Sequence, residues 1–185
     1  MFTPSLKVEE KPSTFDHIRE TQKKKKKAFD HGVGREILAM EESDAKKSRK
    51  WLEDLSKRVT SHDMEAKALE GLQVIHVHRG FVLCNFLVPT CLSDQHGNWH
   101  VGAMATLIDD VGAAAIYSSV GHVKVSVDFN VSYFSTAKIQ EEIEIEAKVV
   151  GELGKLSSVI VQVRRKCNGQ LIALGKQWMA SFSRL

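Results

Sequence analysis

The sequence predicts an α+β domain in which one antiparallel sheet wraps around a single helix. From residue 72 onward, six short stretches have the alternation or the β-rich composition of strands. One helical stretch, from Ala103 to about Ser119, separates the second of these from the third. This helix is apolar around most of its circumference, so it must be surrounded by other elements and cannot lie on a surface.

The order of the elements is two strands, one helix and four strands. The first two strands flank a turn at Arg79-Gly80, and a long loop then leads into the helix. Asn168-Gly169 between the last two strands predicts a hairpin with a primed turn. This order matches the hotdog arrangement, with strands expected at residues 73–78, 81–88, 123–133, 143–150, 156–167 and 171–182.

The chain before residue 71 differs from this domain, and we interpret residues 1–70 as a charged N-terminal extension. Residues 1–35 are expected to be largely unstructured, because such a segment buries too little apolar surface to offset its ordering entropy. The basic run Lys23–Lys27 is either a solvated tail or a contact for a nuclear import receptor or an anionic surface.

One amphipathic helix is expected within the extension, from Ser43 to Val59. Ser43 or Asp44 would cap its start. Its apolar face is predicted to pack on the following domain, and that face carries Trp51, Leu52, Leu55 and Val59.

Composition excludes several other classes of protein. Hydrophobic residues make up 43% and charged residues 26% of the chain, and the net charge of +3 is too small to indicate nucleic acid as the main partner. No apolar run approaches the roughly 20 residues of a membrane span, and we expect neither a secretory signal nor a transit peptide. Three scattered cysteines, Cys84, Cys91 and Cys167, indicate free thiols in a reducing compartment and no zinc site.

Asp109 stands inside the predicted apolar helix, where aspartate is a poor helix former and a carboxylate is costly to bury. This position suits a catalytic carboxylate. Two structural alternatives remain: Asp109 or Asp110 faces solvent at the edge of the helix, or one of them pairs with a buried lysine or arginine.

The start of the same helix offers a second catalytic element. Backbone amides there lack partners within the helix and lie at the positive end of its dipole, so they can stabilise a carbonyl oxygen that becomes negative. Gly102 allows a ligand to approach the backbone closely. Asp109 lies seven residues beyond Gly102, about 10 Å along the helix. If both act on one carbon atom, Asp109 must come from a second subunit, and a two-fold dimer would hold two such sites.

Three motifs carry a resemblance: Trp99-His100-Val101-Gly102, Ala105-Thr106-Leu107-Ile108-Asp109 and Val125-Ser126-Val127-Asp128-Phe129-Asn130. Through them residues 71–185 resemble the acyl-CoA thioesterase branch of the hotdog superfamily, in particular the acyl-coenzyme A thioesterase 13 type and its plant relatives. The resemblance implies hydrolysis of an acyl-CoA to a free acid and CoA. CoA is then part of the substrate, and no other cofactor or metal is expected. It also implies a homo-oligomer, either a dimer or a dimer of dimers.

The resemblance further implies roles for individual residues. Asp109 matches the catalytic carboxylate, which acts as a general base on water or as a nucleophile. The backbone amide of Val101 matches the donor that polarises the thioester carbonyl, and His100 matches the histidine that shapes this turn. Ser126 matches a serine that assists from the partner's strand, and Asp94 stands where relatives carry Asn or Gln.

Two of these matches have alternatives. If Asp94 lies near Asp109, the two like charges would raise the pKa of one of them. The strict alternation of the strand puts Ser126 on one face with Asp128 and Asn130, which suits a polar residue that merely faces an interface.

Similar proteins hold CoA along the loops at strand ends, which correspond here to residues 133–138 and 151–156. The candidate CoA contacts are therefore Tyr133, Ser135, Lys138 and Lys155. Taken alone, each lysine is more simply interpreted as a solvated surface charge. The acyl chain is expected against the central helix and the partner subunit.

Two further functions stay open: an enoyl-CoA hydratase of the same fold, and a non-catalytic acyl-CoA-binding protein that uses the added N-terminal segment. The C-terminal Ser183-Arg184-Leu185 fits a variant of the peroxisomal S-K-L address, so a peroxisomal location is expected, and otherwise a cytoplasmic one.

Overall fold

The computed structural model describes residues 34–181. The basic run Lys23–Lys27 and the tripeptide Ser183–Leu185 lie outside the described residues. The chain divides after Met40 into two units, and the second unit, Glu41–Leu185, holds the sheet and the residues discussed below.

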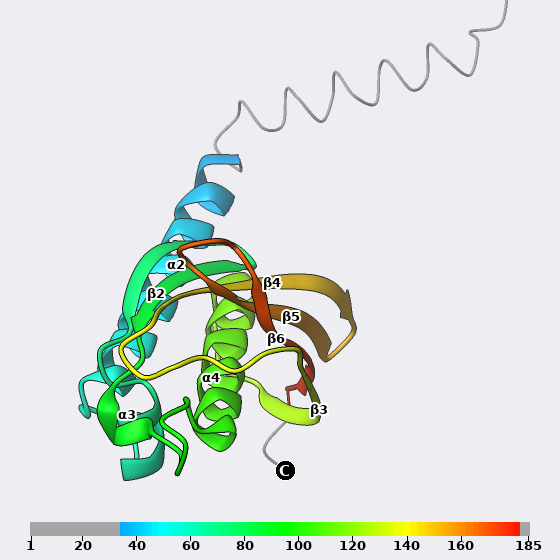
Figure 1. Cartoon of the computed structure of the whole chain (residues 1–185). Coiled ribbons are helices and arrows are strands. Elements are labelled where there is room, and N and C mark those ends of the chain that lie inside the picture. The colour runs from blue at the N-terminus through cyan, green and yellow to red at the C-terminus, as the bar shows by residue number, and fades with distance from the viewer. Residues whose placement is uncertain (1–33, 182–185) are drawn as a thin grey trace, which may run out of the picture. The chain divides into compact units, whose positions relative to one another are not determined.

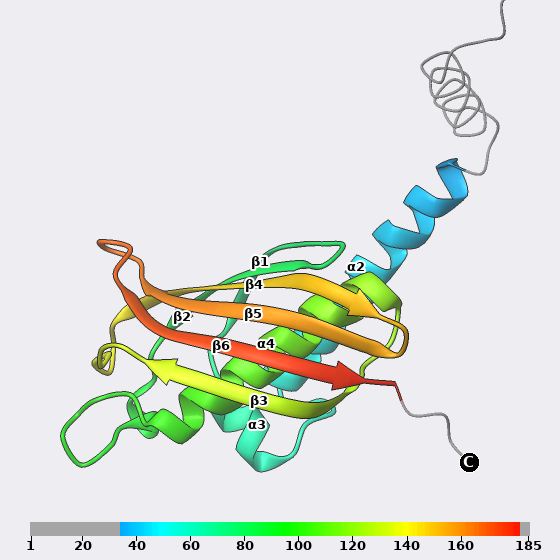
Figure 2. The same ribbon diagram turned by 90° about the vertical axis from the view of Figure 1, so that its right-hand side faces the viewer.

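Six strands form one antiparallel sheet in the order β1-β2-β4-β5-β6-β3 (Figure 2). β1 and β3 are therefore its two edges. The six predicted strands are confirmed, with bounds β1 (Gln73–His78), β2 (Phe81–Leu87), β3 (Val125–Tyr133), β4 (Glu142–Leu153), β5 (Leu156–Arg165) and β6 (Leu171–Ala180).

The long helix α4 (Val101–Val120) runs across the concave side of this sheet (Figures 1 and 2). It is buried on several sides at once, as its apolar circumference predicts, and residues such as Leu107, Ile108, Val111 and Ile116 have no exposed surface. Gly121 ends the helix in the left-handed conformation, with a φ of 77° that glycine adopts without strain. The predicted hotdog arrangement is confirmed.

The helix α2 (Gly34–Ser56) starts earlier and ends sooner than predicted, so Ser43 and Asp44 lie inside it and cannot cap it. Val59 lies beyond its end and is 65% exposed, so the prediction that Val59 lies on the packed face was wrong. The predicted packing on the domain is confirmed, because Leu52 is fully buried and the Ser48 hydroxyl donates to the Ala114 carbonyl of α4 at 2.6 Å.

Two short helices, α3 (Asp63–Ala68) and the 3₁₀ helix η2 (Thr90–Leu92), were not predicted. Both are shorter than the window in which helical periodicity is detectable. They lie before β1 and after β2.

The hairpin at Asn168-Gly169 is confirmed, but its turn type was wrong. Of the two turn residues Asn168 and Gly169, only Gly169 has a positive φ. A primed two-residue turn with Asn-Gly at its centre needs a positive φ at both residues. The strands separate at Arg165, whose amide donates to the Gln170 carbonyl and whose carbonyl accepts from the Gly169 amide. The loop therefore spans four residues.

Within residues 34–181, no helix is long and apolar enough to cross a membrane.

Candidate active site

His100 forms the start of α4. Its backbone is extended, and its imidazole Nδ1 accepts a hydrogen bond from the Gly102 amide at 3.1 Å, so the side chain caps the helix. A Cβ atom on Gly102 would lie 3.1–3.2 Å from the imidazole, which explains why this turn suits glycine. The predicted turn-shaping geometry of His100 is thus present.

The cap uses the Gly102 amide and leaves the amide of Val101 available. Among the described residues, the Val101 N–H has no hydrogen-bond partner. This donor stands at the first position of a 20-residue helix, where the dipole favours negative charge. The Val101 backbone can therefore receive a polarised carbonyl oxygen.

Asp109 lies on α4 where the helix passes β3 and β6, and it is half-buried. Its Oδ1 accepts hydrogen bonds from the Ser126 hydroxyl of β3, at 2.9 Å, and from the Gln177 side-chain amide of β6. The same Gln177 nitrogen lies 2.8 Å from the Ser126 oxygen. No lysine or arginine of the described chain pairs with this carboxylate, so neutral donors hold it.

A β-bulge places Ser126 at this site. The register with β6 pairs Ser126 with Met179 but Asp128 with Trp178, so the strand alternation reverses between residues 126 and 128. Paired residues share a face of an antiparallel sheet. Ser126 therefore faces α4, whereas Asp128 faces away from it. The prediction that Ser126 and Asp128 share a face was wrong. Strict alternation could not reveal a bulge.

Gln177 was not identified from the sequence. It is 1% exposed and sits at an inward position of β6. Gly112 of α4 makes room for it, because a Cβ there would lie 2.6 Å from the Gln177 Oε1. The available signal was a polar side chain at an inward position of an alternating strand, where burial requires a partner.

The structure keeps Asp109 and the Val101 amide of one chain apart. Both belong to one uninterrupted helix, eight residues from each other, which corresponds to about 12 Å of rise. Ser126 and Asp109 belong to the same chain and would enter a shared site together.

Asp94 is engaged within its own loop. Its carboxylate accepts from the backbone amides of His96 and Asn98, at 2.8 and 2.9 Å, and from the Asn98 side chain at 3.2 Å. The hydrogen bond from the Asn98 backbone is the main reason why the pKa of Asp94 is lowered. Within one chain, Asp109 is not among the groups that shift the pKa of Asp94.

The predicted CoA contacts fall into two groups. Tyr133, Ser135 and Lys138 lie near the start of α4, whereas Lys155 lies in the β4–β5 turn, which is anchored just beyond the other end of this helix. The Tyr133 hydroxyl donates to the Val101 carbonyl at 3.2 Å, and the Lys138 ammonium donates to the Asn98 side chain at 2.6 Å. Ser135 accepts from Arg165 at 3.2 Å. Lys155 stands in the turn between β4 and β5.

Lys124 anchors the turn that carries Lys155. Although Lys124 is only 6% exposed, its ammonium donates to the Lys155 carbonyl at 3.1 Å and to the Ser157 hydroxyl at 2.8 Å. The backbone of this turn is therefore fixed.

Asp110, the neighbour of Asp109, is half-buried and has one buried, unsatisfied carboxyl oxygen. Its Oδ2 has no hydrogen-bond partner among the described residues. Burial, with smaller contributions from the negative charges of Asp109 and Glu65, raises the pKa of Asp110 from 3.8 to about 8. The group is thus protonated in the folded protein near neutral pH.

This shift predicts a pH-dependent stability difference for Asp110→Asn. The folded state holds the proton to a higher pH than the unfolded chain, so the free energy of unfolding of the wild type falls as pH rises from 3.8 toward about 8. The variant lacks this loss of stability. We therefore expect the Tm of the variant minus that of the wild type to grow from about pH 5 to about pH 8. Each kcal/mol of difference in the free energy of unfolding should shift Tm by about 2–4 °C. Thermal unfolding at both pH values checks this, and parallel Tm profiles would contradict it.

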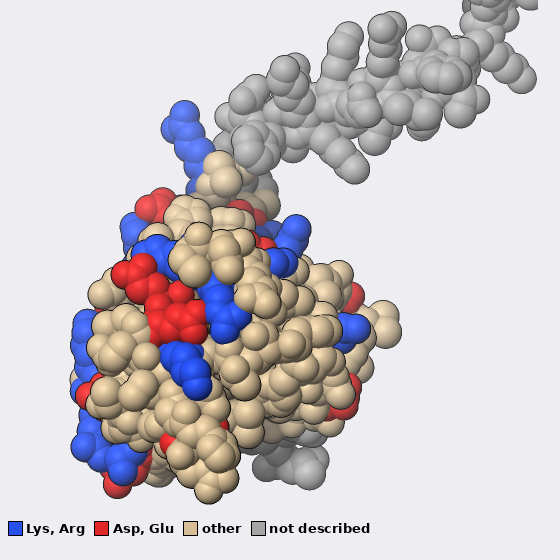
Figure 3. Space-filling view, viewed as in Figure 1, with Lys and Arg blue, Asp and Glu red and all other residues tan. Residues whose placement is uncertain are grey.

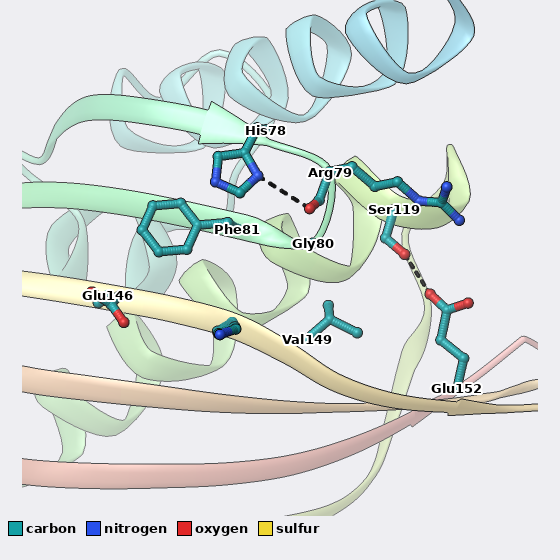
Figure 4. Close-up of a pocket in the computed structure, with 9 residues that line it drawn as sticks. His78, Arg79, Gly80, Phe81, Ser119, Glu146, Val149 and Glu152 are labelled. Carbon is teal, nitrogen blue, oxygen red and sulfur yellow. Dashed lines mark hydrogen bonds between the residues drawn. The ribbon is translucent and has the colours of Figure 1, made fainter. Parts of the chain in front are cut away.

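A pocket of about 510 Å³ lies elsewhere, beside the turn between β1 and β2 (Figure 4). Two pairs of its lining residues contact each other: Ser119 donates to Glu152, and the His78 ring stacks on Phe81 with centroids 4.6 Å apart. Asp109 and the start of α4 do not line it. Despite its size, we do not assign the chemistry to this pocket.

In the described part of the chain, no group of three or more His, Cys, Asp or Glu side chains is placed to hold a metal ion. All three cysteines are free, as predicted.

Comparison with known proteins identifies the family. Residues 96–172 match the thioesterase superfamily. Acyl-coenzyme A thioesterase 13 of Homo sapiens is 31% identical over 126 residues, covering 68% of this chain and 90% of the relative. The protein of the same name from Mus musculus is 32% identical over 111 residues, covering 60% of this chain and 79% of the relative. The crystal structure of zebrafish thioesterase superfamily member 2 matches with a TM-score of 0.66 at 31% identity, covering 71% of this chain and 96% of that one.

These matches confirm the resemblance that the sequence motifs indicated. The chain belongs to the thioesterase superfamily and is a hotdog-fold thioester hydrolase related to acyl-coenzyme A thioesterase 13.

Proposed function

We propose that this protein hydrolyses acyl-CoA thioesters to a free acid and CoA, with Asp109 as general base in a site shared by two subunits. One observation carries the proposal: Ser126 and Gln177 hold the half-buried Asp109 carboxylate at the side of α4. The name of the relatives, acyl-coenzyme A thioesterase 13, supplies the substrate class.

In the proposed reaction, a water molecule attacks the thioester carbonyl carbon while Asp109 takes its proton. The described hydrogen bonds to Asp109 end on Oδ1, which leaves Oδ2 to accept that proton. The carbonyl oxygen becomes negative and accepts a hydrogen bond from the Val101 amide of the other subunit. The carbon–sulfur bond then breaks, and the proton held by Asp109 passes to the CoA sulfur.

The edge strand β3 is the surface on which a second subunit would dock. Every β3 residue except Val131 is exposed, including the apolar Val125, Val127 and Phe129. The part of the molecular face where β3 lies carries few charged side chains, whereas acidic and basic groups gather on the opposite half (Figure 3). An unpaired edge strand with apolar side chains pairs readily with another chain. A two-fold dimer is the smallest assembly that would contain the shared site.

Val127→Glu is expected to weaken this dimer and to abolish most activity, because it buries a charge in the proposed interface. Light scattering after size exclusion should show a monomer at micromolar concentration. Ile75→Glu on the opposite edge strand β1 is the matched control, since Ile75 is similarly exposed at 47%. A fully active monomeric Val127→Glu protein would rule out a shared site.

For CoA, we propose that the segment from Tyr133 to Lys138 of one subunit and the Lys155 turn of the other contact its phosphates. The Lys124 anchor supports this, because a fixed turn presents its groups without ordering cost.

Release of free thiol from a panel of acyl-CoA esters by the purified protein tests the proposed function directly. We expect turnover with saturated acyl groups. Tight binding without thiol release would indicate a non-catalytic binding protein, and water addition to enoyl-CoA without thiol release would indicate a hydratase.

A further inference from the structure

A small apolar pocket lies beside the start of α4, between α3, η2 and the first turn of the helix. Its volume is about 290 Å³, near the lower end of the range for small-ligand pockets. Ala68 of α3 and Leu92 of η2 line it and are almost completely buried, at 1% and 8% exposure. Met64 of α3 is 71% exposed and forms part of its rim.

This pocket adjoins the proposed oxyanion donor. His100 and Gly102, the residues on either side of Val101, both line it. A carbonyl group bound at the Val101 amide would therefore lie next to this pocket.

A thioester carbonyl carries two substituents, the acyl group and the CoA arm. The start of α4 is bordered by a polar segment and by an apolar pocket. The segment from Tyr133 to Lys138 reaches it through polar contacts, namely the Tyr133 hydrogen bond to Val101 and the pairing of Asn98 with Lys138. The pocket beside α3 offers apolar walls instead. An apolar acyl group gains more from such walls than the polar CoA arm does.

We infer that this pocket binds the acyl group of the substrate, of short to medium length, and that Met64 sets the longest chain that fits. The inference rests on the proposed function. α3 lies in the segment before the sheet, so that segment would contribute to substrate selection.

The experiment measures kcat/KM for acetyl-, hexanoyl-, decanoyl- and hexadecanoyl-CoA with the wild type, Met64→Trp and Met64→Ala. Each methylene that enters the pocket should raise kcat/KM about fourfold until the pocket is full. Met64→Trp should move this limit to shorter chains, reducing kcat/KM for decanoyl-CoA about tenfold or more while acetyl-CoA changes less than about twofold. Met64→Ala should move the limit to longer chains. Because Met64 is exposed, both variants are expected to fold.

Ile75→Trp, an exposed apolar residue outside the pocket, is the control and should keep the wild-type profile. Calorimetric binding of the same esters to Asp109→Asn, alone and combined with each Met64 change, separates the pocket from the chemistry. Unchanged chain-length profiles in both turnover and binding would overturn the acyl pocket and leave the thioesterase proposal intact. A shifted binding profile without turnover by the wild type would support the pocket and refute the proposed hydrolysis.

Discussion

Asp109→Asn should reduce kcat for acyl-CoA hydrolysis by about 10²–10⁴-fold, the usual contribution of a general base. Asparagine keeps the shape of the side chain and can still accept hydrogen bonds from Ser126 and Gln177 on its oxygen. It cannot take a proton from water. KM should therefore change little while kcat falls, and a steady-state assay of thiol release measures both.

The matched control is Asp54→Asn, which changes the same chemical group on α2, outside both β3 and the hydrogen bonds of Asp109. Its kcat should stay within about twofold of the wild type. If Asp109→Asn retained wild-type kcat, the general-base assignment would be wrong.

A single turnover in ¹⁸O-labelled water tests how Asp109 acts. A general base directs the label into the product acid. If Asp109 instead attacked the thioester as a nucleophile and water then opened the resulting anhydride at the aspartyl carbon, the label would enter Asp109.

Val101→Pro should lower kcat by about 10²–10³-fold, the cost of removing one oxyanion donor. Proline lacks the backbone N–H, and the first position of a helix is the one helical position where it is favoured. The preceding residue, His100, already has the extended backbone that proline requires, with a ψ of 126°. The substitution therefore removes a single donor while the helix start and the His100 cap persist.

Val101→Ala is the control for Val101→Pro, because it shortens the side chain, which is 56% exposed, and keeps the amide. It should retain most of the wild-type activity. Circular dichroism and Tm show whether the proline variant is folded. A folded Val101→Pro protein with full activity would exclude this amide as the oxyanion donor.

The sequence was sufficient to predict the fold because its strongest signals are local. An apolar helix among alternating strands has few compact solutions, and the helix and six strands occur where these patterns placed them. The elements missed, α3 and η2, span only six and three residues and leave no periodic trace. The start of α2 was placed too late because its first turns carry no clear apolar face.

The candidate site was predictable where a residue type was anomalous in its own segment, as Asp109 is in an apolar helix. Gln177 was missed because its role depends on which residues of α4 and β3 pack against β6, and one strand does not specify this packing. Ser126 was grouped on one face with Asp128 because a single bulge, which reverses the alternation of β3, leaves no trace in the sequence pattern. Long-range packing and local backbone irregularity were thus the two sources of error.

Mixing two inactive variants tests most directly whether the two halves of the site come from different subunits. Asp109→Asn and Val101→Pro chains, unfolded together and refolded or coexpressed, form mixed dimers in which one of the two sites has both native groups. Random pairing makes about half of the dimers mixed, so we predict recovery of about one quarter of the wild-type activity, against almost none for either variant alone. If the mixed dimers form and activity stays at the level of the separate variants, Asp109 and the Val101 amide do not meet across a subunit boundary.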